Sequence, residues 1–283
     1  MVFPSFHEQA FREDVVTQAD SAFVGSIPEI YDSYLGPMLF EPFALDLARR
    51  FVGFEGAMLE TAAGTGRVTR ALVEAIAPEA RLTATDLNEP MLARAAQVVQ
   101  APNLIWRQAD AQALPFDDDA FDAVVCQFGV MFFPDKLAAF SEARRVLRSS
   151  GQLVFNVWDR IEDNAVSKLV HDTITALFPD DPPGFFARGP FGWHDQDQIR
   201  ETLTRAGFGE VGIETVTLPT PARSATDAAT GLCAGSPMAA EIETRRPGGL
   251  VAATEAVVQA LRSRYGDGAF ADQGQALVVT ARV

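Results

Sequence analysis

The chain has 283 residues, 48% hydrophobic and 22% charged, so it can bury a sizeable core and is long enough for one large α/β domain with insertions. Its 23 Lys and Arg against 38 Asp and Glu give a formal net charge of −15, which disfavours nucleic acid as a partner because an acidic surface repels phosphate. Two cysteines and three widely spaced histidines predict neither a disulfide framework nor a metal site.

The N-terminal stretch MVFPSFHEQAFREDVV has neither a basic start nor a continuous apolar core, so we expect no signal peptide. The longest apolar tract, around AVVCQFGVMFF, is too short and too interrupted to span a membrane. We therefore expect a cytoplasmic protein that does not associate with membranes.

Strand and helix patterns alternate between residues 57 and 157. Five short apolar runs predict buried strands, namely Ala57–Leu59, Leu82–Thr85, Leu104–Trp106, Ala123–Cys126 and Leu153–Val157. Helical apolar stripes separate them, for example Val68, Leu72 and Ile76. Repeated strand–helix–strand units predict a doubly wound, three-layer α/β fold with a mostly parallel sheet.

This rhythm breaks after Trp158. We expect one helix and a Pro- and Gly-rich loop in 160–194, followed by a helix that is capped by Asp195 and ended by Gly207. A strand at Val211–Thr215 and a helical stretch over 224–265 come next. The last strand, from Leu277, is expected to run antiparallel at the end of the sheet. The prediction is a single domain, 1–283, with its core at about 37–159, 195–218 and 274–283 and helical cap insertions at about 160–194 and 219–270.

A glycine turn follows the first predicted strand, in the pattern E-x-A-x-G-x-G at Glu60, Ala62, Gly64 and Gly66. Glycines there let the backbone pass close to a nucleoside, and the following helix N-terminus adds unpaired N–H donors. Asp86 ends the second predicted strand, 20 residues after the last glycine (86 − 66), where a carboxylate can accept hydrogen bonds from both hydroxyls of a ribose.

Two nucleotide classes share these features, nicotinamide dinucleotides and S-adenosylmethionine. The dinucleotide fingerprint has a third glycine, but Thr69 occupies that position. Glu60 would also repel a diphosphate and suits a ligand with an amino group and a sulfonium. A third acid, Asp110, follows the third predicted strand and is expected at the same sheet edge, where its carboxylate can accept from an adenine amino group.

At this point the sequence resembles class I S-adenosylmethionine-dependent methyltransferases, in particular the branch with quinone-biosynthesis C-methyltransferases and other small-molecule enzymes. The resemblance lies in LETAAGTGRVTRAL, TATDLNEPMLARA, ADAQALPFDDDAFDAVVCQFGVMFF and EARRVLRSSGQLVFNVW, over about Leu59 to Trp158. It implies a seven-stranded sheet with an antiparallel last strand, and S-adenosylmethionine as cofactor with S-adenosylhomocysteine as product. The N-terminal segment, 1–36, would cover the cofactor.

The resemblance also implies a set of cofactor-binding residues. By position in the motifs these are Tyr31, Glu60, Ala62, Gly64, Gly66, Asp86, Leu87, Met91, Asp110, Ala111, Gln127 and Phe128. Glu60, Gly64 and Gly66 would line the methionine part, Asp86 would hold the ribose, and the others would lie beside the adenine or the reacting end. Ala62 departs from the family pattern, where many members have glycine. Tyr34, three residues after Tyr31, competes with it for the place over the cofactor.

No catalytic signature emerges, and His194 and Tyr31 are only weak candidates for a catalytic residue. Trp158 would line an acceptor pocket. The prediction is a small-molecule methyltransferase with a cap that selects an apolar or aromatic acceptor, and the methylated atom (O, N or C) stays open. An NAD-dependent oxidoreductase and a non-catalytic S-adenosylmethionine-binding protein are the alternatives.

Overall fold

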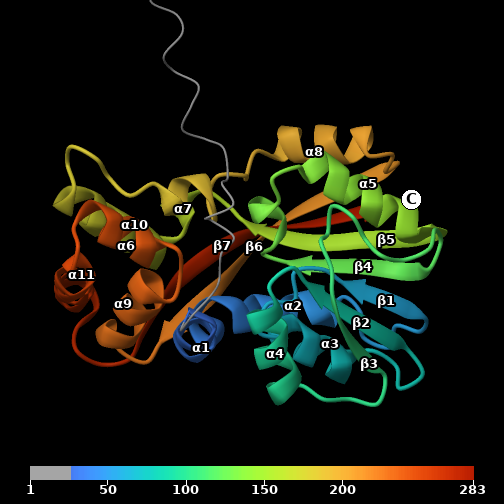
Figure 1. Cartoon of the computed structure of the whole chain (residues 1–283), viewed down its shortest axis with the longest axis horizontal. Helices are drawn as coiled ribbons and strands as arrows, with labels where there is room; N and C mark the ends of the chain where they lie inside the picture. The colour runs from blue at the N-terminus through green and yellow to red at the C-terminus, as the bar shows by residue number, and fades with distance from the viewer. Residues whose placement is uncertain (1–26) are drawn as a thin grey trace, which may run out of the picture.

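A computed structural model describes residues 27–283 and contains a seven-stranded sheet in the order β3-β2-β1-β4-β5-β7-β6 (Figure 1). The strands are β1 (Ala57–Glu60), β2 (Arg81–Asp86), β3 (Leu104–Gln108), β4 (Phe121–Gln127), β5 (Leu147–Trp158), β6 (Glu210–Ala222) and β7 (Phe270–Arg282). The neighbours from β3 through to β5 pair in parallel, whereas β7 runs antiparallel to both β5 and β6. The predicted doubly wound sheet with an antiparallel last strand is confirmed.

The position of the last strand was predicted wrongly. β7 inserts between β5 and β6, and β6 forms the edge of the sheet. The reason lies in burial, because the consecutive residues Leu277, Val278 and Val279 are all at most 2% exposed. A strand buried on both faces belongs inside a sheet.

Helices cover both faces of the sheet. α2 (Glu41–Arg49), α3 (Arg67–Ala75) and α4 (Glu89–Val98) lie on one face, and α5 (Lys136–Val146) and α8 (Gln196–Arg205) lie on the other (Figure 1). Each turns an apolar stripe inward, and on α3 this stripe includes the buried Val68 and Leu72. The predicted cap of α8 is present, since the Asp195 carboxylate accepts from the N–H groups of Asp197 and Gln198.

A second set of helices gathers at one end of the sheet (Figure 1). This helical group comprises α6 (Ala165–Leu177), α7 (Phe185–Arg188), α9 (Ala225–Ala234), α10 (Met238–Arg245) and α11 (Gly249–Tyr265). A two-stranded ribbon connects it to the sheet, because β5 pairs with β7 only from Ala276 onward, whereas β6 pairs with β7 back to Phe270. The helical group is therefore joined to the core through the long strands β6 and β7.

The N-terminal elements bridge these two parts. α1 (Ile27–Ile30) leads into η2 (Tyr31–Phe40), a π-helix that contacts both α2 and α9. Two 3₁₀ turns, η3 (Val130–Phe132) and η4 (Ile161–Asp163), complete the elements of residues 27–283. Of the predicted covering segment 1–36, residues 1–26 lie outside the described residues.

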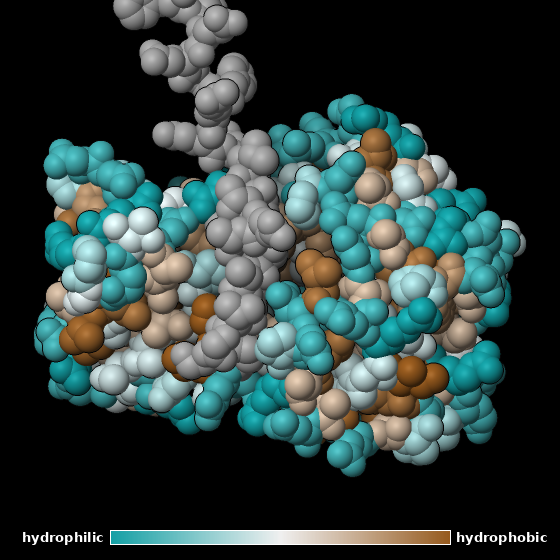
Figure 2. All heavy atoms as spheres, viewed as in Figure 1, coloured by the Kyte–Doolittle hydropathy of each residue, from teal (hydrophilic) through white to brown (hydrophobic). Residues whose placement is uncertain are grey.

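The visible surface is mostly hydrophilic, with scattered apolar residues (Figure 2). This agrees with the acidic composition of the chain. Within residues 27–283, none of the helices has the length and apolar character needed to cross a membrane.

Candidate active site

Four neighbouring parallel strands end in polar residues at one edge of the sheet. Glu60 ends β1, Asp86 ends β2, Gln127 ends β4, and Asp110 follows β3 by two residues. A cleft of about 1180 Å³, which includes open solvent at its mouth, lies along this edge. We refer to it as the sheet-edge cleft, in the position where open α/β sheets bind ligands.

The sheet-edge cleft brings together most of the predicted site residues. Those that line it are Tyr31, Ala62, Gly64, Asp86, Leu87, Met91, Asp110, Ala111, Gln127 and Phe128. Other lining residues were not predicted from the sequence, namely Asn88, Ala109, Gln112, Gly129, Phe132, Phe133 and Pro134. Most of these adjoin a predicted residue or belong to the tract FGVMFFP, which was interpreted mainly as apolar.

Asp86 fixes the glycine turn against the cleft. Its Oδ2 accepts a hydrogen bond from the N–H of Gly64 at 2.8 Å, and its Oδ1 accepts from the N–H of Asn88 at 2.8 Å. Burial raises the pKa of the Asp86 carboxyl, and these two N–H donors act in the opposite direction. Gly64 has a φ of 57°, a conformation that glycine adopts without steric cost.

The turn also holds a residue in an unfavourable conformation. Ala62 has a φ of 54°, which L-residues other than glycine seldom adopt. Ala62 lines the cleft, so its methyl group lies at a position where many members of the family have glycine.

Glu60 lies beneath the turn and does not line the cleft. Its side chain is fully buried, Oε1 accepts from the Thr69 hydroxyl at 3.0 Å, and Oε2 has no hydrogen-bond partner. Burial raises the pKa of the Glu60 carboxyl to about 8, and the negative charge of Asp86 adds to this effect. Gly66, at the start of α3, also stays outside the lining, so the predicted contacts of both residues with a ligand stay predictions.

The two candidate tyrosines point to different places. Tyr31 lines the sheet-edge cleft and stacks on Phe40 with 4.8 Å between ring centroids. Tyr34 lies beside Arg223, whose guanidinium is 5.6 Å from the tyrosine ring centroid, in a separate surface hollow. Tyr31 is therefore the tyrosine placed at the site.

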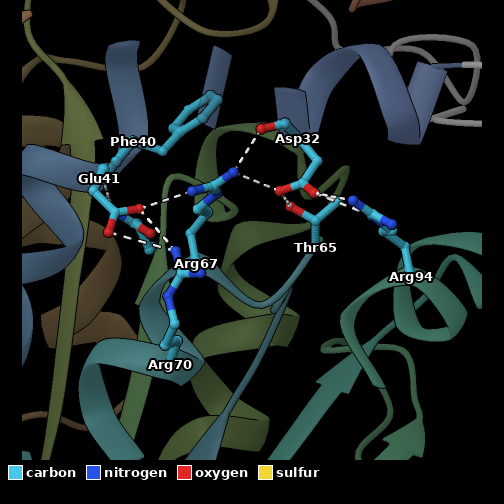
Figure 3. Close-up of polar contacts among 8 residues, drawn as sticks. Asp32, Phe40, Glu41, Thr65, Arg67, Arg70 and Arg94 are labelled. Atoms are coloured by element: carbon cyan, nitrogen blue, oxygen red, sulfur yellow. Dashed lines mark hydrogen bonds and ion pairs between the residues drawn. The ribbon is translucent and has the colours of Figure 1, made fainter. Parts of the chain in front are cut away.

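A cluster of ion pairs fastens η2 to the helices behind the cleft (Figure 3). Asp32, next to Tyr31, accepts from Arg67 of α3 at 2.6 Å and from Arg94 of α4 at 2.8 Å. Glu41, the first residue of α2 directly after η2, pairs with Arg67 at 2.9 Å and with Arg70 at 3.1 Å. We call these five residues the arginine clamp, and it holds the segment that carries Tyr31 over the turn.

A second cavity adjoins the first and is strongly apolar. Eight of its fifteen lining residues are aromatic, and it shares Tyr31, Phe128 and Phe132 with the sheet-edge cleft. Trp158 lines it, as predicted, and stacks on Phe128 with 4.0 Å between ring centroids and an interplanar angle of 10°. We call it the aromatic cavity. Its other lining residues come from η2, η3, the helical group and the loop after α7.

Asn156 supports this wall and was not predicted. Phe128 has a φ of 49°, and its N–H donates to the Asn156 Oδ1 at 2.9 Å. This hydrogen bond stabilises the strained backbone that presents the Phe128 ring to both cavities.

His194 is not brought to the site. It lines neither cavity, and its Nδ1 lies 2.9 Å from the carbonyl oxygen of Phe191. The geometry therefore gives no support to His194 as a catalytic base.

The side chains that line the sheet-edge cleft suit a cationic ligand. Among residues 27–283, those that line the cleft include Asp86 and Asp110 with their carboxylates but no Lys or Arg. A diphosphate needs cationic or N–H donors, whereas a sulfonium or ammonium gains from nearby carboxylates.

Comparisons with known proteins agree with this geometry. A model described as a methyltransferase domain matches residues 59–155. The chain is 25% identical to the ubiquinone/menaquinone biosynthesis C-methyltransferase of Saccharophagus degradans over 75% of this chain and 85% of that protein. It is 44% identical to the same-named protein of Paracoccus denitrificans, over 34% of this chain and 40% of that protein.

Solved structures share the fold. Haemonchus contortus phosphoethanolamine N-methyltransferase 2, in complex with S-adenosyl-L-methionine, aligns with a TM-score of 0.58 and 18% identity over 93% of this chain and 58% of that one. The Bacillus protein YcgJ aligns with a TM-score of 0.53 and 16% identity over 85% of this chain and 99% of that one. Together, the motifs, the site at the sheet edge and these relatives support a class I S-adenosylmethionine-dependent methyltransferase.

Proposed function

We propose that the sheet-edge cleft holds S-adenosylmethionine through the residues predicted from the sequence. Asp86 accepts hydrogen bonds from the ribose hydroxyls, and Asp110 accepts from the adenine amino group. Leu87 and Met91 lie beside the adenine ring, and the 52% exposure of Leu87 at the cleft supports this role, since an aromatic ligand would cover it.

The remaining predicted residues serve the methionine and reacting ends. Ala62, Gly64 and Gly66 bring the turn backbone close to the methionine part, with the Glu60 carboxyl beneath it. Ala111 meets the adenine edge, while Gln127 and Phe128 face the reacting end, which Tyr31 closes from above.

The aromatic cavity receives the methyl acceptor, and this assignment rests on one observation. Tyr31, Phe128 and Phe132 line both cavities, so an acceptor in the aromatic cavity meets a cofactor in the cleft across these three rings. When bound, the cofactor supplies a methyl group on a sulfonium, which is already a good leaving group. The contribution of the chain is to orient the two ligands and exclude water.

The aromatic cavity supplies no general base. Of the fifteen residues that line it, only Tyr31 has a titratable side chain, and burial together with the Asp86 charge raises the pKa of Tyr31 well above its usual range. Tyr31 therefore stays protonated at neutral pH. The acceptor is then one whose nucleophilic atom reacts without proton removal by the protein or loses its proton to water.

The acceptor class is a small apolar or aromatic molecule, and nucleic acid is not the substrate. The aromatic lining fits such an acceptor, and the net charge of −15 opposes a nucleic acid. The name of the S. degradans relative refers to quinone biosynthesis, which agrees with an aromatic acceptor. We further propose that the predicted insertions, 160–194 and 219–270, form the cap that selects the acceptor. The core of the domain is then formed by 37–159, 195–218 and 274–283. The enzyme is proposed to be cytoplasmic.

The test is methyl transfer from S-adenosylmethionine to three substrate panels, monitored by S-adenosylhomocysteine release. The panels are small aromatic compounds (simple phenols, naphthols and hydroquinones), transfer RNA, and DNA oligonucleotides. We expect turnover with the aromatic panel and none with the two nucleic-acid panels. The Asp86→Asn variant should lose turnover with every acceptor. Turnover with nucleic acid alone would contradict the acceptor class, and cofactor binding without turnover on any panel would indicate a non-catalytic binding protein.

A further inference from the structure

The aromatic cavity contains a polar group whose hydrogen-bonding capacity is unused. Ser167, in the first turn of α6, lines the cavity and is only 4% exposed. No hydrogen bond joins its hydroxyl to another of the residues 27–283. A molecule that fills the cavity without pairing this hydroxyl would bury it without a partner, which costs binding free energy.

Several other helical hydroxyls of the chain pair within their own helix, although the Thr175 hydroxyl of α6 has no partner either. The hydroxyls of Thr173, Thr254 and Ser236 each donate to the carbonyl four residues earlier, at 2.7, 2.8 and 3.3 Å. Ser167 makes no such bond to Asp163, which precedes α6. Its hydroxyl is therefore available to a molecule in the cavity.

The end of α6 around Ser167 also favours a partner of negative character. Asn164 precedes the helix but makes no side-chain cap to it, because its amide holds β7 through the N–H and carbonyl of Gln275, at 3.0 and 3.1 Å. The first turn of α6 contains no acidic residue, and the nearest acids along the chain, Glu162 and Asp163, lie in η4 before it. An uncapped helix N-terminus attracts an oxygen that carries negative or partial negative charge.

The position of Ser167 separates it from the methyl donor. It lines the aromatic cavity but not the sheet-edge cleft, whereas Tyr31, Phe128 and Phe132 line both. An acceptor atom that reaches the cofactor lies on the side of these three rings. A group bound at Ser167 belongs to another part of the same molecule.

From this arrangement we infer that Ser167 is a specificity-determining residue, which donates a hydrogen bond to an oxygen of the acceptor remote from the methylated atom. The inference rests on the proposed function. It narrows the acceptor to an apolar ring compound that carries a carbonyl or hydroxyl oxygen away from the site of methylation. Ring compounds without such an oxygen leave the hydroxyl unpaired and bind less well.

The experiment compares two probes of the same shape that share one hydroxyl for the cofactor side and differ in the remote group, naphthalene-2,6-diol and 6-methyl-2-naphthol, by equilibrium dialysis against the full chain saturated with S-adenosylhomocysteine. For each protein, the ratio of the two Kd values is compared with that of the wild type, so that the difference in probe hydration cancels. Ser167→Ala should reduce the preference for the diol by about three- to tenfold, as expected for the loss of one hydrogen bond.

Two variants serve as controls. Ser167→Thr keeps the hydroxyl and should restore the preference to within about twofold. Ser236→Ala removes a second hydroxyl of the same cavity that is already bonded to Leu232, and should leave the ratio unchanged. An unchanged ratio in Ser167→Ala, or an equal weakening of both probes, would overturn the inference by showing a packing role only.

Failure of the proposed function has a different signature. If S-adenosylhomocysteine does not bind, the assignment of the sheet-edge cleft is wrong. If S-adenosylhomocysteine binds but the protein retains neither probe, the aromatic cavity is not the acceptor site. The proposed role of Ser167 is then wrong as well.

Discussion

The buried carboxyl of Glu60 gives the most specific prediction for the protein without cofactor. Its pKa is raised from 4.5 to about 8 because the side chain is fully buried. In the unfolded chain the carboxyl ionises near its ordinary pKa, while in the folded chain it keeps its proton up to about pH 8. Its contribution to stability is therefore complete below pH 4.5 and is lost progressively as the pH rises towards 8.

The size of the effect follows from linkage. Between these two pKa values, each pH unit costs about 1.4 kcal/mol for one proton. From about pH 5 to pH 7 the wild type should thus lose roughly 2 to 3 kcal/mol of unfolding free energy through Glu60 alone. Glu60→Gln removes the titration and keeps the shape of the side chain. The unfolding free energy of the variant relative to that of the wild type should therefore rise by this amount over the same pH interval.

The assay is urea denaturation of wild type and variant, without cofactor, at several pH values from about 5 to 8. The difference between the two unfolding free energies isolates Glu60, because the other titrating groups contribute equally to both. Glu74→Gln, at an exposed position of α3, is the matched control and should show no such divergence. Parallel pH profiles for Glu60→Gln and wild type would refute the reasoning.

Three further substitutions test the rest of the site. Asp86→Asn should weaken S-adenosylhomocysteine binding by at least about tenfold in calorimetry, since a charged acceptor for the ribose hydroxyls is lost. Asp32→Asn should lower the unfolding free energy by about 2 to 3 kcal/mol in urea denaturation, because Arg67 and Arg94 lose a buried partner. It should also weaken S-adenosylhomocysteine binding. The control Asp46→Asn, in the surface pair with Arg50, should lower the unfolding free energy by under about 1 kcal/mol. Ala62→Gly should raise the unfolding free energy by about 0.5 kcal/mol, because relief of the positive φ exceeds the entropy that glycine adds to the unfolded chain; a loss of stability would mean that its methyl group packs productively.

Local patterns were sufficient for the first five strands and for one edge of the site. The apolar runs from Ala57 to Val157 all lie within β1 to β5. In consecutive parallel strands the carboxyl ends meet at the same edge, so the placement of Asp86 and Asp110 follows from sequence order alone.

Features that depend on distant packing were not accessible in this way. Tyr31 and Tyr34 would share a face of an α-helix at three-residue spacing, but they lie in a π-helix, whose wider i→i+5 turn separates them. Nothing near Glu60 in the sequence indicates that Thr69 covers it and excludes it from the cleft. The aromatic cavity joins residues from η2, β5 and the helical group, and no single segment contains its pattern.

The most direct test of the central claim is thermal unfolding of the chain with S-adenosylmethionine, S-adenosylhomocysteine, NAD and NADP in turn. A ligand present at about 100 times its Kd stabilises by roughly 2.7 kcal/mol, which raises the Tm of a chain of this size by about 5 to 10 °C. Such a rise with the first two ligands alone is the predicted result. A rise with NAD or NADP instead, or with none of the four, would contradict the assignment of the sheet-edge cleft.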